Sequence, residues 1–230
     1  MEVTVFHGSP RKGNTYRAAT IFMEEMKKHD DVNITEFFLP RALPEFCTGC
    51  QTCLSSPSEN CPHAVYVGPI LAAILKSEAL IFTSPHFSRN MSGAMKNLLD
   101  HLDFLTMNIA PQESIFRKRA FIITTGTGSK AAIRPIKGFI RNWGINRVYS
   151  YGIRMYTNKW DMMPTPKQAK HEHKLRRAAG RFYNTGIKRP YISSIFMYHV
   201  FRSILRKYVG EGAYPFEYWK QHGFFKRRPF

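Results

Sequence analysis

Met1-Glu-Val-Thr-Val-Phe6 is an apolar, strand-like run, and Gly8-Ser-Pro-Arg-Lys-Gly-Asn-Thr15 follows it and leads into a helical pattern over residues 15–28. The run has the β-branched and aromatic composition of a buried strand, while the helical pattern gathers its apolar residues on one stripe. A strand, a polar loop and a helix in this order predict a unit of a parallel sheet, because parallel neighbours need a crossover connection.

The same alternation continues through the first two thirds of the chain. The expected strands cover residues 2–6, 33–38, 79–83, 119–125 and 147–153. The expected helices cover residues 15–28, 66–76, 93–105, 131–143 and 165–183. Continuously apolar strands are typical of a parallel sheet covered on both faces, so we expect a doubly wound α/β domain over residues 1–186. Ligands of such domains bind at the carboxyl ends of the strands.

The chain has 230 residues and a formal net charge of +18, and residues 154–230 hold 17 Lys and Arg against 4 Asp and Glu. This asymmetry indicates either an anionic partner or a solvated basic face without a dedicated partner. The chain opens without the features of a signal peptide, and no apolar stretch reaches the roughly 20 residues that span a bilayer. We therefore expect a cytoplasmic protein.

The first loop combines hydroxyl and amide side chains with two cations in front of a helix. Ser9, Asn14 and Thr15 supply donors, and Arg11 and Lys12 supply positive charge. A helix N-terminus with such neighbours suits a compact phosphate monoester. The loop matches neither dinucleotide nor nucleoside triphosphate motifs, and the alternative is a capped helix with a polar turn.

Two further loops carry residues suited to a planar ligand. Ser84-Pro-His-Phe87 follows the third strand, and Thr124-Thr-Gly-Thr-Gly-Ser129 follows the fourth. The first places a polar and an apolar ring at the edge of the sheet, and the glycines of the second allow close approach of backbone to a flat group. Each loop alone is better explained as an ordinary polar connection, but a phosphate loop together with two loops suited to flank a planar ring is a stronger combination.

Four cysteines form the pattern C-x2-C-x2-C-x7-C within residues 47–61, at Cys47, Cys50, Cys53 and Cys61. Four thiolates in one loop meet the ligand count of a [4Fe–4S] cluster, and Cys61-Pro62 has the Cys-Pro ending found in ferredoxins. Free thiols, a zinc ion or a disulfide are the alternatives, although zinc more often takes two separated CxxC pairs.

Taken together, these loops and the cysteine pattern resemble the NADPH-dependent FMN reductase and iron–sulfur flavoprotein group over roughly residues 1–155. The resemblance implies a flavodoxin-like fold with strand order 2-1-3-4-5. It implies FMN, with the phosphate on the first loop and the ring between the second and third loops, and NAD(P)H as cosubstrate. It also implies a homodimer or homotetramer.

When the family's residues are carried over by position, the resemblance assigns three groups of residues in this chain to contacts with FMN. The phosphate would lie on Ser9, Arg11, Lys12, Asn14 and Thr15; the ring would be bordered by Pro85, His86, Phe87, Ser88, Arg89 and Asn90, with Thr125, Gly126 and Gly128 on its other side. Relatives often have Tyr where this chain has Phe87, so a hydroxyl contact is lost. They also often have acidic residues after the last cysteine, where this chain has Pro62-His-Ala-Val-Tyr66.

Residues 187–230 form a C-terminal extension beyond the expected domain. Ser193–Val209 has the pattern of an amphipathic helix, and Tyr214–Phe225 is dense in aromatic residues. Packing on the chain's own domain or in an oligomer contact is the favoured interpretation. An anionic membrane surface is the second, and nucleic acid is the least favoured.

These patterns predict an FMN-dependent oxidoreductase that passes electrons from NAD(P)H or a reduced protein to a small-molecule or protein acceptor. No catalytic side chain is expected, because the flavin carries the chemistry. A non-enzymatic iron–sulfur flavoprotein that only carries electrons is the alternative. A third interpretation is a flavin-binding regulatory or membrane-associated module.

Overall fold

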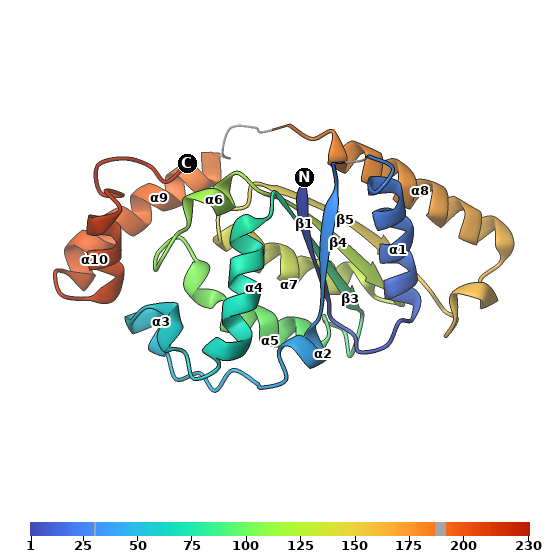
Figure 1. Cartoon of the computed structure of the whole chain (residues 1–230), viewed down its shortest axis with the longest axis horizontal. Helices are drawn as coiled ribbons and strands as arrows, with labels where there is room; N and C mark the ends of the chain where they lie inside the picture. Colours follow the sequence, from blue (N-terminus) through green and yellow to red (C-terminus); the bar gives the residue numbers. More distant parts are fainter. Residues whose placement is uncertain (30, 187–191) are drawn as a thin grey trace.

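The computed structural model describes residues 1–29, 31–186 and 192–230, with a five-stranded sheet at its centre (Figure 1). The strands are β1 (Glu2–His7), β2 (Asn33–Phe38), β3 (Ala79–Pro85), β4 (Arg119–Thr125) and β5 (Arg147–Ile153). Their order is β2-β1-β3-β4-β5, and every pairing is parallel. The expected doubly wound fold and its strand order are therefore confirmed.

Helices cover both faces of the sheet, as Figure 1 shows. One face is covered by α1 (Asn14–Met26) and α8 (Thr165–Tyr183), and the other by α4 (Ala64–Lys76), α5 (Gly93–His101) and α7 (Ser129–Asn142). Short helices α2 (Leu39–Ala42), α3 (Thr52–Ser55) and α6 (Glu113–Phe116) lie in the connections. Beyond them come α9 (Ile192–Ile204), a π-helical turn (Leu205–Val209) and α10 (Tyr214–Gln221).

Two expected helices end about one turn earlier than predicted. The helix expected over residues 93–105 stops at His101, and Asp103–Leu105 continues as a 3₁₀ turn. Phe104 and Leu105 are buried in this turn, so the apolar pattern runs on although the helix does not. The helix expected over residues 193–209 changes into the π-helical turn after Ile204, and Gly210 closes it by donating to Leu205 O at 2.9 Å.

Alternate side chains of each strand enter separate cores on the two faces of the sheet. Phe6 and Phe82 pack toward α4, α5 and α7, whereas Val5 and Ile81 pack toward α1 and α8. Phe22 of α1 is fully buried in the second core. Its ring lies 4.4 Å from the ring of Phe121 and 5.8 Å from that of Phe182 (centroid distances), which joins α1, β4 and α8.

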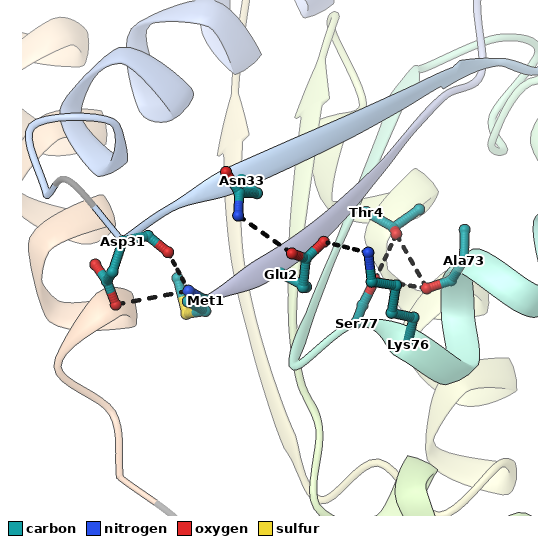
Figure 2. A network of polar contacts seen from close by, with 8 residues as sticks. All are labelled: Met1, Glu2, Thr4, Asp31, Asn33, Ala73, Lys76 and Ser77. Atoms are coloured by element: carbon teal, nitrogen blue, oxygen red, sulfur yellow. Dashed lines mark hydrogen bonds and ion pairs between the residues drawn. The ribbon is translucent and has the colours of Figure 1, made fainter.

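A polar network fixes the amino end of β1 (Figure 2). Glu2 accepts a hydrogen bond from Asn33 at 3.2 Å and forms an ion pair with Lys76 at 3.5 Å. The Thr4 hydroxyl contacts the Ser77 hydroxyl and donates to Ala73 O at 3.3 Å. The network ties β1 to β2 on one side and to the end of α4 on the other.

The helices α9 and α10 share a small aromatic core of their own. Tyr198 and Trp219 stack at 5.6 Å between ring centroids, and the Tyr198 hydroxyl donates to Phe224 O at 2.8 Å. The segment also contacts the main body, because the Tyr218 hydroxyl donates to Pro111 O at 3.2 Å. The expected start of the extension, residues 187–191, lies outside the described residues.

Within the described part of the chain, no helix combines the length and the apolar character needed to cross a membrane.

Replacing Phe22 with Ala should lower the free energy of unfolding by about 3–5 kcal/mol, because the side chain is fully buried and its removal leaves a cavity. Phe46→Ala is the matched control, because Phe46 is 72% exposed and its loss should change stability by less than about 0.5 kcal/mol. Urea denaturation of both variants measures the difference. Equal losses would show that the second core is not packed as described.

Candidate functional site

A cavity of about 430 Å³ lies at the carboxyl edge of the sheet, the lower edge in Figure 1. The loops that follow β1, β3, β4 and β5 converge there. Parallel strands bring their carboxyl ends to one edge, so four loops far apart in sequence meet around one space.

The loop after β1 presents a helix N-terminus to this cavity. Gly13 is the N-cap of α1, and among the described residues no side chain caps it and no acidic residue lies in the first turn. Within the loop, Arg11 N donates to Ser9 Oγ at 3.2 Å, which folds the polar residues into a tight turn. An uncapped helix N-terminus beside an exposed Arg11 favours an anion.

Two side chains join the start of α1 to the other loops. The hydroxyls of Thr15 and Thr125 lie 2.6 Å apart, and both residues are buried. Asn14 Nδ2 donates to Asn158 O at 3.1 Å, in the loop after β5. These hydrogen bonds hold the helix N-terminus at a set place against the loops that follow β4 and β5.

The loop after β3 forms a tight turn that presents an aromatic ring. Phe87 and Asn90 exchange backbone hydrogen bonds of 2.9 and 2.8 Å. Ser88 and Arg89 between them have φ values of 44° and 66°, which non-glycine residues rarely adopt. Such strain is frequent at functional sites. The Phe87 ring is 47% exposed at the cavity, which makes it available to stack on a ligand.

His86 joins the loop after β3 to the loop after β4. Its backbone N–H donates to Thr125 O at 2.8 Å, and its Nδ1 accepts from Gly128 N at 3.3 Å. A Cβ atom at Gly128 would lie 2.3 Å from His86 Nε2, so only glycine leaves room for the imidazole.

Most of the residues assigned from the sequence line this cavity: Ser9, Arg11, Asn14, Thr15, Pro85, His86, Phe87, Thr125 and Gly126. Lys12 does not, because its Nζ lies over the rings of Tyr16 and Phe38, at 5.2 and 5.6 Å from their centroids. Ser88, Arg89 and Asn90 do not line the cavity either, because they belong to the turn beyond Phe87. Gly128 is also outside the lining, but its backbone N–H donates to His86, which does line it.

Sequence reasoning missed six lining residues: Gly13, Thr127, Met155, Tyr156, Thr157 and Asn158. Four of them follow β5, the one carboxyl-edge loop near the cavity that held no recognisable motif. The rule that parallel strands meet at one edge would have found them. Tyr156 is 78% exposed, so a second aromatic ring stands at the mouth of the cavity.

The cysteine loop lies between α2 and α4 and is held by Asn97 of α5. Cys47 N donates to Asn97 Oδ1 at 3.0 Å, and Asn97 Nδ2 donates to Glu45 O at 2.8 Å. A separate cavity of about 410 Å³ is lined in part by Cys47 and Cys53. The cysteine loop therefore lies on the face of the sheet that is covered by α4 and α5.

The four cysteines are free thiols that influence one another electrostatically. Burial raises the pKa of Cys53 to about 11, and the charges of Cys61, Cys47 and Cys50 act in the same direction. The Thr52 hydroxyl donates to Cys50 Sγ at 3.3 Å and lowers the pKa of that thiol. In residues 1–29, 31–186 and 192–230, no three His, Cys, Asp or Glu are grouped to hold a metal ion. The metal assignment therefore stays a prediction.

Curated proteins of similar sequence include iron-sulfur flavoproteins. An iron-sulfur flavoprotein of Clostridioides difficile (strain 630) is 27% identical over 216 residues, covering 90% of each chain. An iron-sulfur flavoprotein of Archaeoglobus fulgidus is 25% identical over 131 residues, covering 55% of this chain and 60% of the relative.

Solved structures share the fold at low sequence identity. NAD(P)H:quinone oxidoreductase from Methanothermobacter marburgensis superposes with a TM-score of 0.64 at 14% identity, covering 80% of this chain and 98% of its own. An FMN-dependent NADH-azoreductase from Bacillus anthracis, solved in complex with FMN, superposes with a TM-score of 0.61 at 12% identity. The match covers 80% of this chain and 100% of the azoreductase chain. The family described as NADPH-dependent FMN reductase matches residues 1–149, well over half of the sequence. The chain therefore belongs to the NADPH-dependent FMN reductase family.

Proposed function

We propose that this protein is an FMN-dependent oxidoreductase that takes electrons from NAD(P)H and passes them to a small-molecule or protein acceptor. One observation carries the proposal: an anion-binding helix N-terminus and two exposed aromatic rings border a single cavity at the carboxyl edge of the sheet. FMN has the matching chemistry, a phosphate at one end and a planar apolar ring at the other.

The residues of the cavity fit FMN in charge, shape and size. Arg11 and the free N–H groups at the start of α1 would hold the phosphate. The backbone at Gly126 and the ring of Phe87 would border the flavin. A volume of about 430 Å³ lies within the usual range of cofactor pockets, roughly 300–1,000 Å³.

The chain's own residues contribute positioning rather than proton transfer. The bound flavin supplies the hydride and electron chemistry. The Thr15–Thr125 hydrogen bond keeps the phosphate end and the ring end of the cavity at a constant separation. The backbone bond from His86 N to Thr125 O couples the two loops that flank the ring.

The names of similar proteins guide the choice of acceptor. They include a quinone oxidoreductase, azoreductases and an NADH:FMN oxidoreductase. An exposed Phe87 and Tyr156 at the mouth would accept a flat aromatic acceptor by stacking. We therefore propose quinones and azo compounds as the first acceptors to test.

Anaerobic addition of NADPH or NADH to the FMN-loaded protein should bleach the flavin absorbance, and a quinone or azo compound should restore it with turnover. Stopped-flow absorbance measures both steps. Bleaching by dithionite or a reduced ferredoxin alone would contradict the enzyme and favour the electron carrier. Absence of bound flavin would contradict both.

Arg11→Gln should weaken FMN binding by roughly tenfold or more, because a charged hydrogen bond to phosphate contributes about 1.5–3 kcal/mol. Lys12→Gln is the matched control, since Lys12 lies over Tyr16 and Phe38 rather than in the cavity. It should change the affinity by less than about twofold. Fluorescence titration of the apoprotein measures both, and an equal loss in the two variants would contradict the position of the phosphate.

We further propose that the cysteine loop holds a [4Fe–4S] cluster. The donor set has the right number and chemistry, since Cys47, Cys50, Cys53 and Cys61 supply four thiols from one loop. The curated relatives of similar sequence are named iron-sulfur flavoproteins. These four thiolates would ligate the iron, and the cluster would exchange single electrons.

Protein purified anaerobically should contain about four iron and four sulfide per chain. Cys53→Ser should lose most of the iron and keep FMN, because the flavin cavity includes no cysteine. Ser55→Ala, in the same loop, should retain both. Iron, sulfide and flavin assays read the result. Wild-type protein with flavin but without iron would remove the cluster from the proposal, and zinc in its place would favour the zinc alternative.

The remaining proposals concern assembly and organisation. We propose a homo-oligomer, supported by the exposed Ile192 (85%) and Phe196 (64%) of α9, whose apolar side chains a second copy would cover. We propose the division into a domain over residues 1–186 and an extension over 187–230, and a reducing, cytoplasmic location in which four free thiols persist.

A further inference from the structure

A single helix, α5, contacts both ends of the cysteine loop, which runs along the lower part of Figure 1 between α2 and α4. Asn97 and His101 lie four residues apart on α5, so they share one face, about 6 Å apart along the helix axis. Both side chains are almost fully buried, with exposures of 5% and 2%. Buried polar side chains are normally fixed by hydrogen bonds, and in this case the bonds lead to the loop.

Asn97 fixes the start of the cysteine loop through both ends of its carboxamide. Its Oδ1 accepts from the backbone N–H of Cys47 at 3.0 Å, and its Nδ2 donates to Glu45 O at 2.8 Å and to Leu43 O at 3.4 Å. An aspartate would offer no donor at this position, and a leucine would offer neither a donor nor an acceptor. The first cysteine is therefore held by its backbone, which leaves its thiol free to bind a ligand.

His101 fixes the other end of the loop through its two ring nitrogens. Its Nδ1 donates to Asn97 O at 3.0 Å, because a carbonyl oxygen only accepts. Its Nε2 lies 2.9 Å from Nδ1 of His63, so these two nitrogens share a hydrogen bond. His63 comes two residues after Cys61 and is the N-cap of α4. The end of the loop is thus joined to the same helix that holds its start.

The backbone between the two ends follows a path that needs support from its surroundings. Gly49 and Gln51, on either side of Cys50, have φ values of 69° and 60°. This left-handed region is readily adopted by glycine but is unfavourable for glutamine. Such a conformation persists where the surrounding structure fixes it, and the two contacts from α5 supply a constraint of that kind.

The same helix is also fixed at the flavin cavity. α5 follows the loop that presents Phe87, and its N-cap is Ser92. The backbone N–H of Ser92 donates to Ser84 Oγ at 2.9 Å, which ties the start of α5 to the end of β3. Asn97 and His101 therefore hold the cysteine loop on an element whose other end is fixed beside the flavin site.

We propose that Asn97 and His101 are positioning residues of the cysteine site: they hold both ends of the loop in place, so that a metal group has only to gather the thiols between them. The inference rests on the proposed metal-binding role of the four cysteines. Because the ends are fixed in advance, less chain entropy opposes binding. Both residues act through their hydrogen bonds to Cys47 and His63, and not as ligands.

Cobalt(II) is a suitable probe, because it reports on the thiols whichever metal group they hold in the cell. The protein as purified is freed of metal by a chelator under anaerobic, reducing conditions and is then titrated with cobalt(II) at constant pH. The ligand-field absorption of thiolate-bound cobalt is followed at wavelengths beyond the flavin bands. We expect one saturable cobalt per chain, with the spectrum of a tetrahedral thiolate site.

Asn97→Leu should weaken cobalt binding roughly tenfold or more, because the backbone of Cys47 loses its hydrogen-bond partner in a buried place. Asn60→Leu is the matched control. Asn60 lies in the same loop, directly before Cys61, but it is exposed. Its replacement should change the affinity by less than about twofold.

His63→Ala should weaken cobalt binding by a similar factor, and His63→Asn should restore part of the affinity, because the amide keeps a donor near the position of Nδ1. His101→Leu should act like His63→Ala, since it removes the other half of the same contact. An effect of His63→Ala that His101→Leu does not reproduce would contradict the role of His101, because His63 would then ligate the metal itself.

Circular dichroism and flavin content show which variants fold. Unchanged cobalt affinity in folded Asn97→Leu and His63→Ala proteins would overturn the inference, and so would a wild type whose thiols bind no cobalt. An equal loss in Asn60→Leu would also overturn it, since any change in the loop would then have the same effect.

Iron analysis of the same preparations tests the cluster separately. A wild type without iron, in which cobalt binding still depends on Asn97 and His63, would contradict the [4Fe–4S] cluster and support the positioning role. A wild type with iron, in which the variants bind cobalt as tightly as the wild type does, would support the cluster and contradict the positioning role.

Discussion

The parallel pairing of β1 with β2 on one side and β3 on the other is the constraint on which the rest of this molecule depends. Because the chain passes to opposite sides of β1, the loops leaving β1 and β3 diverge and leave a space at the carboxyl edge. The loops after β4 and β5 close that space, and the Thr15–Thr125 bond fixes its width. With a different strand order, the loops after β1, β3, β4 and β5 would not meet around one cavity.

At the carboxyl edge, Arg11 is exposed and acts together with a helix N-terminus, so little desolvation opposes its positive charge. An anion that binds there can therefore exchange with solvent.

Sequence periodicity was sufficient to predict the sheet, because its central strands β1, β3 and β4 are largely apolar and buried and each is followed by a polar loop. It was also sufficient for most of the flavin cavity, since loop residues such as Ser9 and His86 follow strand ends. It could not place Lys12, whose direction depends on the rings of Tyr16 and Phe38.

The central claim is that the carboxyl edge recognises FMN through its phosphate as well as its ring. The most direct measurement is a comparison of FMN and riboflavin binding to the apoprotein by fluorescence titration or calorimetry. The account predicts one FMN per chain and a weakening of about a hundredfold or more for riboflavin, which lacks the group held by charge-assisted hydrogen bonds. Equal affinities for the two flavins, or binding of neither, would contradict it.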